Sequence, residues 1–125
     1  MRNIIFISLI VFSCTWKKEN FVVAQTSNCD TSNTSYSKVI QPIFQANCYS
    51  CHSTSVTSTG GGLDIQNFTS LTNYLNRNYT GVFGSQFYNV ISQSQGTLPM
   101  PPGYKLPDCD IAKIKAWINK GAPNN

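Results

Sequence analysis

Cys48-Tyr49-Ser50-Cys51-His52 is the stretch of this 125-residue chain that constrains its fold and chemistry most strongly. Two residues separate the two thiols, and an imidazole follows the second thiol directly. The pattern C-x-x-C-H is typical of the attachment site of a c-type haem. Each thiol can add to one vinyl group of the porphyrin, and the histidine then lies under the iron as its proximal axial ligand.

A zinc site and a thioredoxin-like dithiol are the other interpretations of such a cysteine pair. Zinc needs four ligands, and His52 is the only histidine of the chain. The fourth ligand would have to come from Cys29 or Cys109. A thioredoxin-like dithiol should open a helix after a buried strand, whereas this pair follows a helical pattern. The sequence therefore favours a covalent haem.

Size and composition indicate one small exported domain. A chain of this length can build only a modest apolar core, to which a covalent haem would add a large apolar plate. Charged residues make up only 11% of the chain, while Ser, Thr and Asn are plentiful. The net charge of +4 is mild, and basic and aromatic residues do not interleave, so nothing indicates nucleic-acid binding.

The N-terminal residues predict export and a lipid anchor. Residues 1–13 hold one positive charge and an apolar run that is too short to span a bilayer, as in a signal peptide. Val11-Phe12-Ser13-Cys14 resembles a bacterial lipobox, which implies cleavage before Cys14 and lipidation of that cysteine. Cleavage after Ala24 is the alternative. With lipidation, residues 14–34 form a polar tether that holds a periplasmic or cell-surface domain on a bacterial membrane.

The chain contains five cysteines, an odd number that is awkward in an oxidising compartment. Haem attachment accounts for two of them. The other three cysteines are accounted for if Cys14 is lipidated and Cys29 pairs with Cys109. Such a bridge would stabilise the fold by about 4 to 5 kcal/mol as an upper estimate. Two free buried thiols are the alternative, which is disfavoured outside the cytosol.

Apolar residues at helical spacing predict an all-α fold of short helices. The first helix should start near Ser37 or Lys38, because Pro42 is tolerated only in a first turn. We expect Trp117 of the last helix to pack on the first helix and the haem edge, with an indole N–H that could reach a propionate. The predicted helices end at Asn47, run from about Asn67 to Leu75, from Gln86 to Ser92, and from Asp108 to Asn119.

The loop Leu98-Pro99-Met100-Pro101-Pro102-Gly103 is the second candidate functional stretch. Met100 is the only methionine besides the initiator and lies 48 residues after His52. A thioether is a soft ligand that suits haem iron, and the flanking prolines should hold the sulfur in place. Packing of Met100 in the core, Lys105 as the ligand, or an open iron site are the alternatives. Gly60-Gly61-Gly62, in turn, predicts flexible or tight backbone near the haem edge.

Together these segments resemble small class I cytochrome c domains, particularly lipoprotein-like ones from Bacteroidota. The resemblance covers about residues 29–125 and implies an all-helical domain at 35–125 around one covalent haem c. It implies thioether attachment at Cys48 and Cys51, with His52 proximal and Met100 distal. Pro107 departs from the Ser or Thr that often caps the last helix. The motifs that carry the resemblance are Asn47-Cys48-x-x-Cys51-His52, a glycine-rich turn before Leu63, Met100-Pro101-Pro102-Gly103, and Ile111-x-x-Ile-Lys-Ala-Trp-Ile-x-x-Gly-Ala-Pro123.

The function expected from these features is single-electron transfer between redox proteins, outside the cytosol and on a membrane. Iron with both axial positions filled leaves no place for a substrate, so we do not expect an enzyme. An electron-donating subunit of a larger respiratory or surface complex is one alternative. A haem-based peroxidase or gas sensor with a displaceable methionine is another. Four lysines could steer an acidic partner, although a solvated face is the commoner explanation: Lys105, Lys113, Lys115 and Lys120.

Overall fold

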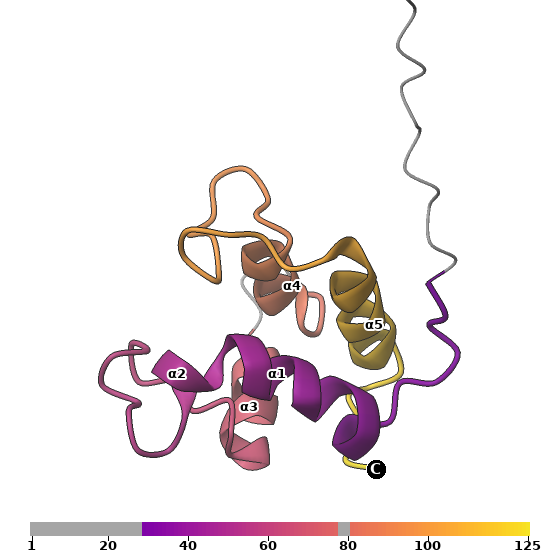
Figure 1. Ribbon diagram of the computed structural model, residues 1–125, viewed down its shortest axis with the longest axis horizontal. Helices are drawn as coiled ribbons and strands as arrows, with labels where there is room; N and C mark the ends of the chain where they lie inside the picture. The colour runs from indigo at the N-terminus through magenta and orange to yellow at the C-terminus, as the bar shows by residue number, and fades with distance from the viewer. Residues whose placement is uncertain (1–28, 78–80) are drawn as a thin grey trace, which may run out of the picture.

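The computed structural model describes residues 29–77 and 81–125, and all regular secondary structure in these ranges is helical (Figure 1). The all-α fold class is thereby confirmed. No helix within the described ranges is long and apolar enough to cross a bilayer. The predicted signal peptide and Cys14 lie outside these residues. The elements are a π-helical turn, η1 (Tyr36–Ile40), and the α-helices α1 (Gln41–Asn47), α2 (Tyr49–His52), α3 (Phe68–Leu75), α4 (Ser85–Ile91) and α5 (Asp108–Asn119).

The first helical segment begins at Tyr36, with a π-helical turn that precedes α1. The carbonyl of Ser35 accepts hydrogen bonds from the amides of both Val39 (2.9 Å) and Ile40 (3.2 Å), which produces the π-helical turn η1. Pro42 then lies in the first turn of α1, where its missing N–H costs nothing. The predicted start near Ser37 was therefore close, but it missed the wider turn.

Cys48 lies between α1 and α2, and its backbone makes hydrogen bonds to both helices. Its φ of −123° departs from helical geometry, yet its amide donates to the carbonyl of Phe44 (2.7 Å). Its own carbonyl accepts a hydrogen bond from the amide of His52 (2.8 Å). The break at Cys48 therefore leaves the whole attachment motif on a nearly continuous helical segment.

Helix α5 has the bounds that the sequence predicted. Pro107 takes the N-cap position without a side-chain hydrogen bond, while Asp108 and Asp110 lie in the first turn, where negative charge is favourable. Gly121 (φ +85°) follows the helix end with the left-handed backbone that terminates many helices. The start of α3 is also confirmed, since the side chain of Asn67 caps the amide of Ser70 at 3.0 Å.

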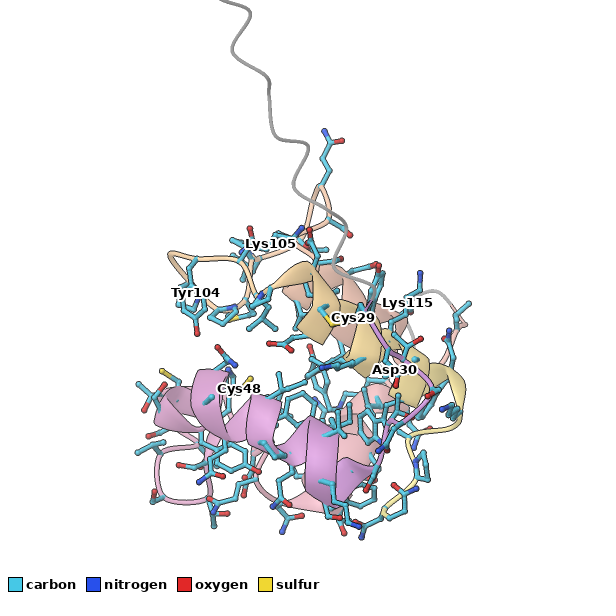
Figure 2. All side chains as sticks on the ribbon, turned by 45° about the vertical axis from the view of Figure 1, so that its right-hand side comes forward. Cys29, Asp30, Cys48, Tyr104, Lys105 and Lys115 are labelled. Atoms are coloured by element: carbon cyan, nitrogen blue, oxygen red, sulfur yellow. A yellow bond between two sulfur atoms is a disulfide. The ribbon has the colours of Figure 1, made fainter. Side chains whose placement is uncertain are left out.

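Aromatic rings from η1, α1, α4 and α5 fill the core. Trp117 is fully buried, stacks on Tyr36 (ring centroids 5.5 Å apart) and meets Phe44 edge-on at 6.1 Å. Phe44 in turn meets Phe87 of α4 edge-on at 5.7 Å. Side chains fill the space between α1 and α5, as Figure 2 shows, except towards the end that carries Cys48. The aromatic cluster is therefore the rigid support for that end of α1.

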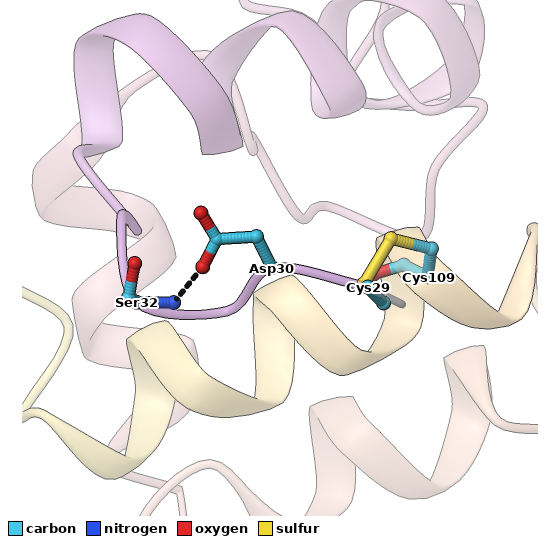
Figure 3. Close-up of a disulfide and its surroundings, with 4 residues drawn as sticks. All are labelled: Cys29, Asp30, Ser32 and Cys109. Atoms are coloured by element: carbon cyan, nitrogen blue, oxygen red, sulfur yellow. Dashed lines mark hydrogen bonds between the residues drawn. A yellow bond between two sulfur atoms is a disulfide. The ribbon is translucent and has the colours of Figure 1, made fainter. Parts of the chain in front are cut away.

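A disulfide joins the first described residue to the last helix. Cys29 Sγ and Cys109 Sγ are 2.06 Å apart, across 80 positions of sequence (Figure 3). Hydrogen bonds from Ser32, including one from its amide at 2.8 Å, lower the pKa of the Asp30 carboxyl. At the other end of α5, Lys120 Nζ donates to the carbonyl of Ser32 (2.9 Å). The described part of the predicted tether is thus attached to α5 at both ends of that helix.

Candidate functional site

The four side chains that the sequence assigned to haem line a single cavity of about 710 Å³. Cys48, Cys51 and His52 come from the α1–α2 segment on one side. Met100 comes from the loop between α4 and α5 on the other side. Figure 2 shows the opening of this region between Cys48 below and Tyr104 above. Segments that are far apart in the sequence therefore meet at one site.

The two thiols of the attachment motif lie in different surroundings. Cys51 is exposed, whereas Cys48 is half-buried, and neither takes part in a disulfide. Burial raises the pKa of the Cys48 thiol to about 12. Because neither cysteine is in a disulfide, both thiols are available for thioether bonds.

The ring of His52 is fixed on its Nδ1 side by backbone groups. Nδ1 lies 3.1 Å from the carbonyl oxygen of Leu63, and since a carbonyl only accepts, Nδ1 must carry the proton. The lone pair therefore resides on Nε2, the arrangement that a metal-binding imidazole needs. The amide of Ile65 also donates to the carbonyl of His52 (2.8 Å), which draws the returning loop against the motif.

Gly60 leaves the space that the His52 ring occupies. A Cβ at this position would lie 2.4 Å from Nδ1 of His52 and 2.5 Å from the carbonyl oxygen of Cys51. A Cβ on Gly61 or Gly62 would meet nothing within 4 Å. The sequence predicted tight or flexible backbone for this glycine run, and the structure assigns the tight contact to Gly60 alone.

Met100 lies in irregular backbone and is half-buried. Its amide donates to the carbonyl of Val90 at the end of α4 (2.9 Å), and its peptide bond to Pro101 is cis. Further along the same loop, the side-chain amide of Gln93 donates to the carbonyl of Tyr104 (2.9 Å). A few hydrogen bonds to α4 and within the loop thus hold this side of the cavity.

One hydrogen bond connects the two sides of the cavity directly. The hydroxyl of Tyr104 donates to Oδ1 of Asn47 across 3.1 Å and 57 positions of sequence. Asn47 is held in turn, because its Nδ2 donates to the carbonyl of Ile43 (2.8 Å). We call this pair the Tyr104–Asn47 bridge. Sequence reasoning gave Tyr104 no role, since no local pattern reveals a partner at that distance.

The cavity wall suits a large apolar plate. Leu63, Ile65, Phe87 and Leu106 are among the apolar side chains that form it. Within the described part of the chain, none of its lining residues is Asp, Glu, Lys or Arg. Gln86 also lines it, and its buried Oε1 has no hydrogen-bond partner, so a polar group of a bound molecule could satisfy this amide. The residues present therefore fit a covalently attached haem.

The structure also bears on one expectation and two alternatives from the sequence: the role of Trp117, Lys105 as an iron ligand, and a zinc site. The indole N–H of Trp117 donates to the carbonyl of Pro123 (3.0 Å), so the expectation that it reaches a propionate was wrong. Lys105 pairs with Asp108 at 2.8 Å, which engages its ammonium away from the cavity wall. For zinc, the described residues contain no cluster of three or more His, Cys, Asp or Glu side chains able to hold a metal ion.

Comparison with protein families gives one finding. The family model described as Cytochrome c matches residues 38–122, which is more than half of the chain. The matched range contains the attachment motif, Gly60, Met100 and all of α5. No curated protein and no solved structure matches the chain.

Proposed function

The chain belongs to the cytochrome c family, and from this premise we propose that it carries one electron at a time with His52 and Met100 as the two axial ligands of its iron. One covalent haem c is the cofactor of such a small domain, and haem-based electron transfer is its general function. When bound, the haem exchanges a single electron between ferrous and ferric iron. The observation that carries the ligand assignment is the meeting of His52 and Met100 in one cavity.

The residues around the cavity have different roles in holding the cofactor. Cys48 and Cys51 supply the two sulfurs for covalent attachment. Protonation of His52 at Nδ1, fixed by the Leu63 carbonyl, keeps Nε2 free for the iron. The apolar wall excludes water, and the thioether of Met100 stabilises the ferrous state relative to a second nitrogen ligand.

A non-enzymatic role is supported by the neutral cavity wall and by the proposed use of both His52 and Met100 to hold the iron. Cleavage of an O–O bond needs an acid, a base or a cation beside the iron. Among the described residues that line the cavity, His52 is the only titratable nitrogen, and the proposed assignment uses it as a ligand. We therefore rank peroxidase or gas-sensing activity below electron transfer.

Location outside the cytosol is typical of this family. We further propose the lipid anchor at Cys14, with residues 15–28 as the tether between the membrane and the disulfide at Cys29. A lipid anchor would restrict the domain to redox partners near the same membrane. As a free carrier or as a subunit of a larger complex, the domain would use the same haem site.

The native mature protein offers a single test of these assignments. We expect its mass to include one haem, the acyl chains on Cys14 and the loss of two hydrogens at the disulfide. Its ferric spectrum should be low-spin, with a methionine-to-iron charge-transfer band. A mass that begins at Gln25 would contradict lipidation, while a high-spin ferric spectrum at neutral pH would contradict the ligand pair.

A further inference from the structure

Leu98 is the most exposed large apolar side chain of the described residues, with 77% of its surface accessible. It lies on the wall of the haem cavity, in the same loop as Met100. Tyr104, which is 48% exposed, borders the cavity as well. Val82, at 62%, is similarly exposed but does not line the cavity. Two of the three exposed large apolar side chains in the described ranges therefore lie beside the haem site.

Charged side chains lie only at the edge of this region, where Lys105 pairs with Asp108. As noted above, the described lining residues include no Asp, Glu, Lys or Arg. Figure 2 shows Lys115 on the side of α5 away from the opening between Cys48 and Tyr104. Its ammonium lies over the ring of Tyr88, 4.7 Å from the centroid.

Two more of the four lysines that sequence reasoning considered for partner steering also have partners. Lys105 Nζ binds Asp108, and Lys120 Nζ binds Ser32 and Thr34. Residues 29–125 carry six positive and four negative side chains, a net charge of only +2. Long-range steering needs a concentrated charge of one sign near the docking site, and this face lacks one.

We propose that the uncharged face around Leu98 and Tyr104 is the docking surface for a redox protein whose own contact face is uncharged and apolar. The proposal rests on the proposed function, since it places the partner beside the haem. Charge complementarity favours this partner over an acidic one, because an acidic face would lose hydration without meeting a cation. Brief redox encounters use small interfaces, for which one exposed leucine and one phenol ring can form the apolar centre.

The first test measures how salt affects electron exchange with two small redox complexes of opposite charge. The haem-loaded protein is reduced, and its oxidation by hexacyanoferrate(III) or tris(1,10-phenanthroline)cobalt(III) is followed by stopped-flow absorption. A neutral face predicts rates that differ by less than about twofold between 20 and 500 mM salt, once the charge of the whole protein is accounted for. A rate with hexacyanoferrate that falls tenfold or more would reveal a positive face and overturn the proposal.

The second test uses a second copy of the protein as the uncharged, apolar probe. Electron self-exchange between reduced and oxidised molecules is measured by NMR, which reports the exchange rate directly. We expect Leu98→Ser to lower this rate about tenfold, since a central contact of a small interface contributes at least that factor. The matched control is Val82→Ser, which removes an exposed apolar side chain away from the cavity and should leave the rate unchanged.

The variants also separate docking from haem packing and from the proposed function. If Leu98 serves only to cover the haem, Leu98→Ser will shift the absorption spectrum and leave self-exchange unaltered, which overturns the docking proposal. Equal losses in Leu98→Ser and Val82→Ser would overturn it as well. Wild-type protein without a covalent haem or a low-spin spectrum would instead contradict the proposed function itself.

Discussion

The two sides of the haem cavity are held in different ways. On the attachment side, helical backbone places Cys48, Cys51 and His52, and the turn at Gly60 packs directly against the imidazole. On the other side, Met100 lies in irregular backbone held by its bond to Val90. The Tyr104–Asn47 bridge then joins the loop to α1.

This difference indicates which ligand is the more easily released. Backbone packing around His52 is dense, so small changes there are costly. Irregular backbone that is held mainly by hydrogen bonds opens at lower free energy than a densely packed segment. We therefore expect perturbations to detach Met100 well before they disturb His52.

The largest effect is expected on the attachment side, for Gly60→Ala. The new methyl group would collide with the His52 ring and the Cys51 carbonyl, where backbone cannot move aside. We predict destabilisation of more than about 4 kcal/mol and loss of most haem-loaded protein. Haem-stained yield and denaturant unfolding measure both quantities. Gly61→Ala is the control: its Cβ meets nothing, and its φ of +64° should cost only about 1 kcal/mol. Equal yields of the two variants would refute the contact.

Removal of the disulfide should lower the free energy of unfolding of the whole domain and should leave both sides of the cavity unchanged. Replacing Cys29 and Cys109 together by serine frees a loop of 80 positions in sequence. We predict a loss of about 3 kcal/mol in the free energy of unfolding, because the unfolded chain regains entropy. The absorption spectrum of the folded protein should stay the same, since neither cysteine lines the cavity. A changed spectrum in the double variant would show that the disulfide also shapes the site.

A smaller effect is expected on the methionine side, for Tyr104→Phe. This change deletes the Tyr104–Asn47 bridge and retains the ring. We predict that the free energy for displacing Met100 falls by about 1 kcal/mol, the typical contribution of one hydrogen bond. Imidazole titration, followed by loss of the methionine-to-iron band, measures this displacement. Tyr88→Phe is the matched control, because Tyr88 lies under Lys115 and does not line the cavity. Unchanged imidazole affinity in Tyr104→Phe would mean that the bridge does not hold the loop.

The last effect lies in the core and appears only at high pH. Burial, and then the neighbouring Tyr49, raise the pKa of the Tyr36 phenol from its usual 10.0 to about 12. The neutral phenol is thus favoured in the folded state, and its stabilisation is complete below pH 10 and is lost as the pH approaches 12. We predict a flatter decline of the free energy of unfolding above pH 10 in Tyr36→Phe, measured by chemical denaturation. Parallel curves for the two proteins would contradict the assignment.

Features that depend on residues close together in the chain, such as helix ends, were predicted correctly from local sequence patterns. Helix α5 has its predicted bounds, because the acidic first turn and Gly121 define its two ends within the segment itself. Helix α3 starts near Asn67 as predicted, and the Asn67 side chain caps it through a hydrogen bond from an amide only three positions away.

Contacts that form only when the chain folds could not be predicted from local sequence patterns. The indole of Trp117 binds the Pro123 carbonyl because the C-terminal residues turn back after Gly121. The role of Gly60 depends on how the loop returns to His52, and the run of three glycines does not distinguish its members. Tyr104 and Asn47 meet only once the loop closes over the cavity.

The most direct test of the account is the ferric absorption spectrum of haem-loaded Met100→Ala beside that of the wild type. We predict that the wild type is low-spin with a methionine-to-iron charge-transfer band. The variant should keep its covalent haem on Cys48 and Cys51, lose that band and become high-spin. A variant spectrum identical to the wild type would contradict the central claim that His52 and Met100 hold the iron between them.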